Sequence, residues 1–261
     1  MENSEQKSSR KLGNVEAMHL ETIAVLGAQG NFGQSLYVRL AEMKGGSAVI
    51  IPTADKLANR EIASRSDTII VAVRPDQVEA LLKEISDQPD RLKPTARIVS
   101  FAARYPLTSI LEITRRPAAR IMADHEWNLS AFFLGGGFSE TDFRSEFSGL
   151  TRTDSIRLTT DREMDMFSVL LVHVFVVSVL SKQGLLPNVA GHLTFLSKQM
   201  GIPLGELQKF QTTGEPEEVL ATGATPGGIT EATLSIIRAN PGITPEQLHD
   251  AVAARFVNRK P

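Results

Sequence analysis

A glycine-rich turn between a short apolar strand and an amphipathic helix constrains the fold of this chain more than any other feature. Gly27, Gly30 and Gly33 follow the apolar run Thr22–Leu26, and apolar residues on helical spacing follow from Asn31. At such a turn the first glycine permits a tight reversal, the second lets the backbone approach a diphosphate, and the third lets helix and strand pack closely. The N–H groups and positive dipole at the helix start attract phosphate. The turn therefore predicts dinucleotide binding, with a purely structural tight turn as the alternative.

The rest of the first half repeats this alternation of β-branched runs and helical segments. Such a pattern is typical of a parallel sheet with crossover helices. Helices are expected over Asn31–Lys44 and Asp76–Ile85, and a turn at Gly135–Gly137. Besides Thr22–Leu26, strands are expected at Ala48–Ile51, Thr68–Val73, Ile98–Phe101 and Arg120–Met122, with an edge strand at Ile156–Leu158.

Strand signals disappear after about Thr160, and helical patterns follow. The expected helices are Met164–Lys182, Pro187–Met200, Leu204–Thr212, Gly227–Arg238 and Pro245–Val257. The sequence thus predicts an α/β fold in which a Rossmann-type doubly wound sheet over residues 22–160 precedes an all-helical dimerisation and substrate domain over residues 161–261. The polar segment 1–21 is expected to be a disordered extension.

Composition excludes several classes of protein. With 42% hydrophobic residues the 261-residue chain can bury a core, and a net charge of -2 provides no basic field for nucleic acid. The absence of cysteine excludes thiolate metal sites and a thiol nucleophile, and it suits a cytoplasmic protein. The apolar run Phe167–Leu180 would span about 21 Å as a helix, short of the roughly 30 Å of a membrane core. We therefore interpret it as a helix buried on all sides, in part at a subunit interface, and expect no membrane span.

The tip of the second strand bears on the choice of cofactor. NAD enzymes usually carry an Asp or Glu there, whereas this tip ends without a carboxylate at Thr53. Thr53, Lys56 and Arg60 are candidates for holding a 2′-phosphate, although Asp55 weakens that argument and all four can be solvated surface residues. The tip favours NADPH, with NADH as the alternative.

Two further strand ends are expected to face the cofactor. The third strand ends in Ala72, Val73, Arg74 and Pro75, and ligands of open α/β sheets bind at such carboxyl ends. Arg74 is a candidate for contacting phosphate or adenine, the alternative being an exposed arginine that closes a strand. The small side chains of Ala102 and Ala103 after the fourth strand would allow a nicotinamide ring to approach the backbone. The predicted cofactor site also includes Gln29, Asn31 and Phe32 of the glycine turn and Met122 at the end of the fifth strand.

A second informative motif is Thr225-Pro226-Gly227-Gly228 at the start of a C-terminal helix. Two glycines in a helix start cost roughly 1 kcal/mol each relative to alanine. Their bare N–H groups would form a receptor for a carboxylate. Thr230 lies about one turn further along and would bring a hydroxyl to the same ligand. The alternative is a capped helix start with flexible glycines.

Together these motifs resemble the pyrroline-5-carboxylate reductase family, from Thr22 to about Phe256. The matching segments, in chain order, are the glycine turn, Ala72-Val73-Arg74-Pro75, Val99-Ser100-Phe101-Ala102-Ala103, Arg120-Ile121-Met122, Thr213-Gly214-Glu215-Pro216 and Thr225-Pro226-Gly227-Gly228-Ile229-Thr230. The first half is also similar to deazaflavin-dependent NADP reductases.

The resemblance implies an NAD(P)H-dependent imine reductase that delivers hydride to the C=N carbon of a cyclic imino acid and forms proline. It further implies a homodimer built by the helical half. Position by position, Thr230 matches the threonine that hydrogen-bonds the substrate nitrogen, and Thr225, Gly227 and Gly228 match the carboxylate-binding helix start. Glu215 joins the predicted substrate site through its matching motif.

Four segments depart from the family pattern, and one of them is Ala221-Thr222, which stands roughly where the family has Lys-Asp before its Ser-Pro-Gly-Gly motif. Met122 is followed by Ala123-Asp124-His125-Glu126-Trp127 instead of Pro-Asn-Thr-Pro, Arg104 replaces a glycine after Ala-Ala, and the Ser-Gly-Ser-Gly-Pro-Ala-Tyr signature is absent from the long helix. If His125 lines the pocket, its near-neutral pKa suits it to protonate a nitrogen or oxygen as hydride arrives. The alternative is that His125 and Trp127 pack under the sheet. Asp124, His125 and Glu126 point in different directions as sequence neighbours, so no metal site is expected.

The sequence leaves two rival functions open. One is a related oxidoreductase with another acceptor, such as an open imine or a deazaflavin. The other is a non-catalytic nucleotide-binding homologue that keeps the Rossmann half without turnover.

Overall fold

A seven-stranded sheet forms the centre of the first half of the molecule. The computed structural model describes residues 20–53, 56–87, 91–124, 126–208 and 228–256. The strand order is β2-β1-β3-β4-β5-β6-β7, with every neighbouring pair parallel except the antiparallel pair β5 and β6. The strands are β1 (Glu21–Leu26), β2 (Ala48–Thr53), β3 (Thr68–Val71), β4 (Arg97–Ser100), β5 (Ala118–Ala123), β6 (Ser130–Gly135) and β7 (Ile156–Arg157).

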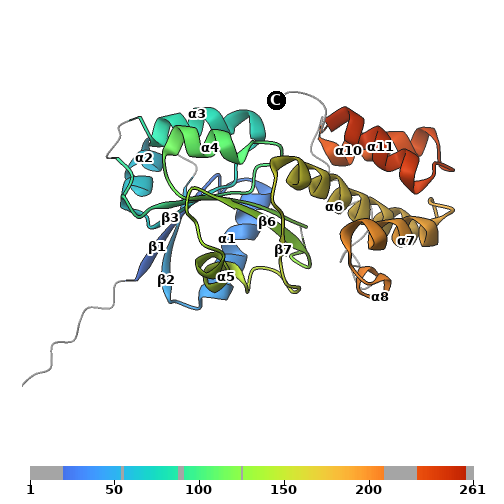
Figure 1. The fold of residues 1–261 in the computed structure, drawn as a ribbon, viewed down its shortest axis with the longest axis horizontal. Coiled ribbons are helices and arrows are strands. Elements are labelled where there is room, and N and C mark those ends of the chain that lie inside the picture. The colour runs from blue at the N-terminus through green and yellow to red at the C-terminus, as the bar shows by residue number, and fades with distance from the viewer. Residues whose placement is uncertain (1–19, 54–55, 88–90, 125, 209–227, 257–261) are drawn as a thin grey trace, which may run out of the picture.

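Helices cover both faces of this sheet, which confirms the predicted doubly wound α/β fold (Figure 1). One face carries α2, α3 and α4, whose apolar residues share a core cluster with the strands, and the other face carries α1 and α5. The helices of this half are α1 (Asn31–Lys44), α2 (Lys56–Arg65), α3 (Pro75–Ile85), α4 (Leu107–Thr114) and α5 (Glu140–Phe147).

Several of these elements differ from the sequence prediction. The helices α2, α4 and α5 and the strand β6 were not predicted, because short segments carry too few apolar positions to establish a period. Glu21, assigned above to the extension, instead belongs to β1 and pairs with Ala48 of β2. The turn starts at Gly136, one residue later than predicted, because Gly135 still ends β6 while Gly136 and Gly137 adopt φ angles of 65° and 85°.

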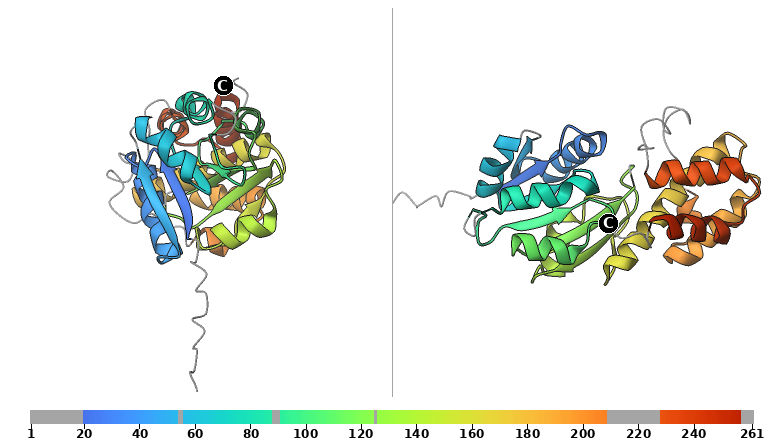
Figure 2. Two further views of the ribbon diagram at one scale, coloured as in Figure 1. Left: turned by 90° about the vertical axis from the view of Figure 1, so that its left-hand side faces the viewer. Right: turned by 90° about the horizontal axis from the view of Figure 1, so that it is seen from above.

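The second half is helical in its described residues, as predicted, and extends to one side of the sheet (Figures 1 and 2). Its helices are α6 (Asp161–Lys182), α7 (Val189–Met200), α8 (Leu204–Leu207), α10 (Ile229–Ala239) and α11 (Pro245–Phe256). α6 starts earlier than predicted because Thr160 and Glu163 form a capping box. By length and composition α6 passes as a membrane helix, but 72% of its most apolar window is buried inside the molecule.

A buried arginine connects the sheet to α6. Arg120 on β5 has no exposed side-chain surface, and its guanidinium forms ion pairs with Asp161 and, at 2.8 Å, with Asp165. The two carboxylates lie four residues apart, so they share one face of α6. Asp161 also accepts a hydrogen bond from the backbone N–H of Leu107 at 2.8 Å. This network fixes the start of α6 against β5 and α4.

Two buried histidines meet inside the helical half. His173 of α6 and His192 of α7 join through a 2.8 Å hydrogen bond between Nε2 and Nδ1. Burial, followed by the neighbouring His192 and His249, lowers the pKa of His173 to about 3. Burial likewise lowers the pKa of His192 and of His249. His173 is thus a core residue, as expected from its apolar helix.

We expect the fold to lose stability on mild acidification through these imidazoles. The unfolded chain binds protons near pH 6.5, whereas folded His173 stays neutral down to about pH 3. A lowered histidine pKa therefore contributes stability that is lost as the pH falls through this window, about 2 kcal/mol from pH 7 to pH 5 for His173 alone. Urea unfolding at pH 7, 6 and 5 measures the loss.

The comparison with a His173→Gln variant isolates this histidine. The wild type should lose about 1.4 kcal/mol more per pH unit than the variant below pH 6. The pH slope of the wild type alone is not sufficient, because burial raises the pKa of Glu146 to about 7. Protonation of Glu146 stabilises the fold as the pH falls over the same range, so only the difference between the two slopes reports on His173. Equal pH slopes for the two proteins would contradict the expectation.

Candidate functional site

The glycine turn has the geometry that its sequence predicts. Gly27 adopts a φ of 90°, and a Cβ there would lie 2.7 Å from the carbonyl oxygen of Ala72. A Cβ on Gly33 would overlap the carbonyl group of Gly27. The backbone N–H of Gly27 donates to the carbonyl of Thr53 at 2.9 Å, which holds the turn against the end of β2. Two of the three glycines are therefore required by the fold itself.

Gly30 is different, because the fold does not require a glycine at this position. Its φ of -72° is ordinary, and the nearest atom to an added Cβ would be 3.7 Å away. It is the N-cap of α1, where Ser, Thr, Asp or Asn would satisfy the free N–H groups, yet no side chain caps this helix. The first turn of α1 also lacks an acidic residue. The helix start is thus left open to an anion.

A cavity of about 480 Å³ opens beside this turn. It lies where the strand order reverses between β1 and β3, which is the position where doubly wound sheets bind their ligands. Its walls come from the glycine turn, from the end of β3 and from α2 and α3. The lining residues are Gly27, Gln29, Gly30, Asn59, Ala72, Val73, Arg74, Asp76, Gln77, Ala80, Leu81 and Glu84. Six predicted cofactor residues are therefore brought to one cavity.

Asn59 is a polar residue of this cavity that the sequence analysis missed. Its side chain on α2 is only 6% exposed, and its Oδ1 atom has no hydrogen-bond partner among the described residues. A buried acceptor without a partner is rare and destabilising, and a ligand in the cavity would supply the missing donor. The one available signal was an asparagine four residues before buried Ala63, on the inward face of α2.

Replacing Asn59 by leucine should weaken cofactor binding five- to tenfold. Leucine keeps the side-chain volume and removes the acceptor, which corresponds to about 1 kcal/mol for one hydrogen bond. Isothermal titration calorimetry with NADPH and NADH measures the change. Asn240→Leu, at the exposed end of α10, is the matched control and should bind like the wild type. Equal affinities for Asn59→Leu and the control would show that Oδ1 does not meet the cofactor.

The other residues predicted at the β2 tip have different surroundings. Thr53 is buried, and its carbonyl holds Gly27 and Ala28. Lys56 begins α2. The Arg60 guanidinium pairs with Asp87 at 3.5 Å and Glu84 at 4.0 Å, so it is engaged with α3 and the residues after it.

At the end of β3, the predicted residues Arg74 and Pro75 form the start of α3. Pro75 is its first residue, and Arg74 is its exposed N-cap.

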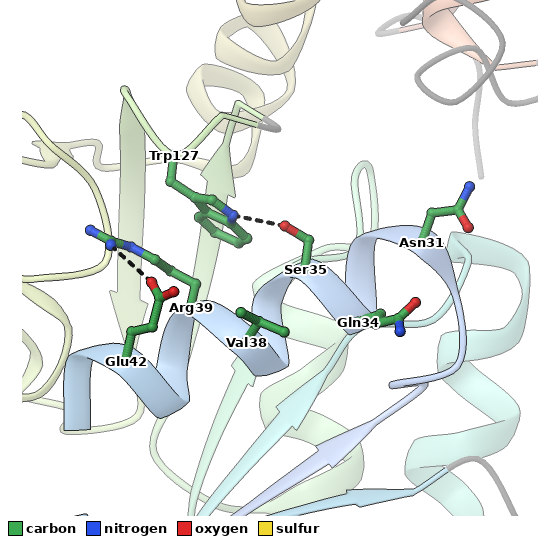
Figure 3. A pocket seen from close by; sticks show the side chains of 7 residues that line it. All are labelled: Asn31, Gln34, Ser35, Val38, Arg39, Glu42 and Trp127. Atoms are coloured by element: carbon green, nitrogen blue, oxygen red, sulfur yellow. Dashed lines mark hydrogen bonds and ion pairs between the residues drawn. The ribbon is translucent and has the colours of Figure 1, made fainter. Parts of the chain in front are cut away.

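Phe32 is turned toward an aromatic cluster and does not line the cavity. Its ring lies 5.5 Å from that of Phe101 and 5.4 Å from that of Trp127. Trp127 donates from its indole nitrogen to Ser35 at 2.9 Å (Figure 3). Asp124 fixes the loop of Trp127 by accepting from the N–H of Leu129 at 2.6 Å. The altered segment thus packs Trp127 onto α1, in agreement with the packing alternative for this residue, whereas His125 lies outside the described residues.

A second cavity, of about 430 Å³, follows the outer face of α1 away from the switch point. Figure 3 shows Trp127 above it and the Arg39–Glu42 ion pair, at 3.6 Å, further along the helix. Asn31, predicted as a cofactor residue, lines this second cavity instead of the first.

The residues predicted near the nicotinamide lie between the two halves. Ala102 and Ala103 follow β4, and Ala103 packs against the hydrophobic cluster of the helical half. Met122 of β5 is buried in that same cluster, together with residues of α6, α10 and α11. Ile229 at the start of α10 also packs against it. This shared cluster connects the end of β4 to the first turn of α10.

Part of the predicted substrate site lies in α10. Gly228 is its N-cap without a side-chain cap, and Thr230 is half-buried in the first turn. The same turn carries Glu231, an acidic residue that the sequence analysis did not assign to the site. His125, Glu215, Thr225 and Gly227 lie outside the described residues. Across the residues that the structure describes, no three His, Asp or Glu side chains gather closely enough to hold a metal ion.

Comparison with known proteins identifies the fold. Neither a family model nor a curated protein sequence matches the chain. Three solved pyrroline-5-carboxylate reductases share its fold. The Plasmodium falciparum protein with NADP bound has a TM-score of 0.53 and 14% identity, covering 91% of this chain and 95% of that one. The Coxiella burnetii protein has a TM-score of 0.52 and 15% identity, and the match covers 90% of this chain and 96% of that one. The Streptococcus pyogenes protein has a TM-score of 0.51 and 17% identity, and the match covers 90% of this chain and 97% of that one. The resemblance seen in the motifs is thus confirmed, and the chain has the fold of pyrroline-5-carboxylate reductases.

Proposed function

We propose that this protein is an NAD(P)H-dependent reductase of a C=N bond in a small carboxylated imine, similar to pyrroline-5-carboxylate reductase. Gly30 is the observation that carries the proposal. An uncapped helix start with a glycine that the backbone does not need is best explained by a diphosphate that must approach closely. The unpartnered Oδ1 of Asn59 in the same cavity supports a bound dinucleotide independently.

The chain would bind and orient both reactants. The N–H groups of the α1 start would hold the diphosphate, and the small side chains of Ala102 and Ala103 would admit the nicotinamide ring. When bound, the cofactor supplies the hydride. The Thr230 hydroxyl would hydrogen-bond the imine nitrogen, and the start of α10 around Gly228 would bind the carboxylate. The protein's contribution is then alignment of donor and acceptor carbon. NADPH is the proposed cofactor, with NADH as the alternative.

A homodimer through the helical half is part of this proposal. Leu185 is 57% exposed and Leu204 is 37% exposed, and both lie beside α6 and α7 in sequence. Burial of such apolar surface by a second copy would stabilise the helical half. Analytical ultracentrifugation at micromolar concentration tests it, and a monomer there would contradict it.

Oxidation of NADPH in the presence of pyrroline-5-carboxylate and related cyclic imines tests the reaction. Thr230→Ala should lower kcat by ten- to a hundredfold, because one hydrogen bond to a charged nitrogen contributes about 1.5–3 kcal/mol. Ser235→Ala on the exposed face of the same helix is the matched control and should retain activity. Cofactor binding without oxidation of any imine would favour a non-catalytic nucleotide-binding protein. Turnover with a deazaflavin alone would favour the other oxidoreductase.

A further inference from the structure

A third cavity, of about 400 Å³, lies where the β7 edge of the sheet meets the helical half. Its walls come from β7 and the residues after it, from the N-terminal part of α6, from the end of α7 and from α11. It shares no lining residue with the dinucleotide cavity, and Thr230 does not line it. Its volume is typical of sites for small molecules. Neither the proposed cofactor nor the proposed substrate accounts for this cavity.

Most of the wall of this cavity is apolar. The apolar lining residues are Ile156, Leu158, Met166, Phe167, Leu170 and Met200. They include one phenyl ring and two thioethers, and both groups form favourable contacts with a further aromatic ring. The wall therefore suits a ligand with an aromatic body.

His249 brings a polar group into these apolar surroundings. The residue is only 8% exposed, and its Nδ1 atom has no hydrogen-bond partner among the described residues. A buried polar atom without a partner is rare and costs free energy. Because burial lowers the pKa of His249, the ring is neutral at pH 7 and does not attract an anion. A hydroxyl is the fitting partner, since it can both donate and accept.

Two charged side chains at neighbouring positions of α6 line the same cavity, and they differ in their partners. Glu163 accepts the backbone N–H groups of Thr159 and Thr160, at 2.7 and 3.2 Å, so it is engaged in capping the helix. Arg162 is exposed and forms no ion pair with the residues that the structure describes. Its guanidinium is therefore available to a carboxylate.

We propose that this cavity is a second ligand-binding site, and that its ligand is a small aromatic carboxylate with a hydroxyl on the ring. The carboxylate pairs with the exposed Arg162, the ring lies against Met166, Phe167 and Met200, and the hydroxyl meets the buried imidazole of His249. This site goes beyond the proposed reductase function and does not depend on it.

Calorimetry on the full-length protein with three matched probes tests the site. The probe 3-(4-hydroxyphenyl)propionate carries both polar groups, 3-phenylpropionate lacks the hydroxyl, and the methyl ester of the first probe lacks the charge. The wild type should bind the hydroxy acid with a Kd of about 100 µM, as expected of a ligand of this size. It should bind each of the other two probes about three- to tenfold more weakly, because each lacks one polar contact.

Two variants assign the two ends of the ligand. Arg162→Met should remove the preference for the acid over its ester and keep the preference for the hydroxyl. His249→Phe should do the reverse, and thermal unfolding checks that it is folded. Because Arg162 is exposed, Arg162→Met keeps the test decisive even where His249→Phe does not fold. Arg238→Met removes an exposed arginine of α10 that does not line this cavity, and this control should bind all three probes like the wild type.

Saturation with NADPH separates this site from the dinucleotide cavity. The affinities for the three probes should stay within about twofold, because sites without shared residues are usually independent. Displacement of the probes by NADPH would place them in the dinucleotide cavity and overturn the inference. Equal binding of the three probes, or an acid preference that survives in Arg162→Met, would overturn it as well. So would a wild type that binds no probe at millimolar concentration, the result expected if a second copy of the chain covers the cavity.

Discussion

Replacing Gly30 by aspartate should leave the fold intact and weaken dinucleotide binding by about a hundredfold. The φ of -72° accepts any residue, and aspartate is a favourable N-cap for α1, so stability should stay equal or rise by a few tenths of a kcal/mol. The new carboxylate would sit on the open N–H groups that the diphosphate needs. Repulsion between carboxylate and phosphate at about 4 Å is between 1 and 4 kcal/mol at effective dielectric constants of 80 and 20.

Titration calorimetry with NADPH and NADH measures this loss, and thermal unfolding checks the fold. Gly205→Asp adds the same charge on α8, where an added Cβ meets no atom within 4 Å, and should bind cofactor like the wild type. Gly30→Asp should keep or raise stability while it lowers affinity for the dinucleotide. This combination is expected of a binding site, whereas a purely structural turn would leave the affinity unchanged. If Gly30→Asp binds NADPH as tightly as the control does, the diphosphate does not lie at this helix start.

Removing the buried charge of Arg120 should have the largest effect on stability. Arg120→Met leaves Asp161 and Asp165 facing each other without a cation and also removes the connection from β5 to α6. Breaking a buried ion pair from one side typically costs 3–5 kcal/mol, and because both carboxylates are partly exposed we expect a value of about 3 kcal/mol. Urea unfolding followed by circular dichroism measures it.

Two further variants test the cause of this loss. The triple variant Arg120→Met, Asp161→Asn, Asp165→Asn removes the uncompensated charges and should recover at least half of the lost stability. Arg162→Met removes an exposed arginine at the start of α6 that forms no ion pair with the described residues, and it should change stability by less than about 0.5 kcal/mol. A triple variant as unstable as Arg120→Met would point to lost packing and not to charge.

The glycine turn shows how far local sequence determines this protein. Gly27 and Gly33 are fixed by backbone crowding that a strand–turn–helix junction creates wherever it occurs, so their positions could be interpreted from spacing alone. The same holds for α1, whose bounds were predicted to the residue, and for α6, whose apolar run indicated burial on all sides. The spacing of apolar residues indicates which face of an element is buried, and this can be recognised from the element's own sequence.

Weakly patterned segments were the first limit of that reasoning. α2 and β6 have too few residues or too little contrast between faces, and they form because neighbouring elements cover them. Asn59 lies on α2, so it was missed together with that helix although it lines the cavity at the predicted diphosphate site. Phe32, inside the glycine turn, was assigned to the cofactor and instead packs against Trp127.

Local sequence patterns were enough to predict the class of fold, the uncapped start of α1 and the change from sheet to helices near Thr160. Which distant groups meet became visible only in the folded molecule. Arg120 contacts Asp165 across 45 residues, His173 contacts His192 across 19, and the guanidinium of Arg104 lies over the ring of Phe256 in the other half. The sequence around one side chain does not indicate its distant partner, because the partner depends on the strand order in the sheet and on how the helical half packs against it. Local patterns fix the elements, and packing between them fixes the chemistry at their junctions.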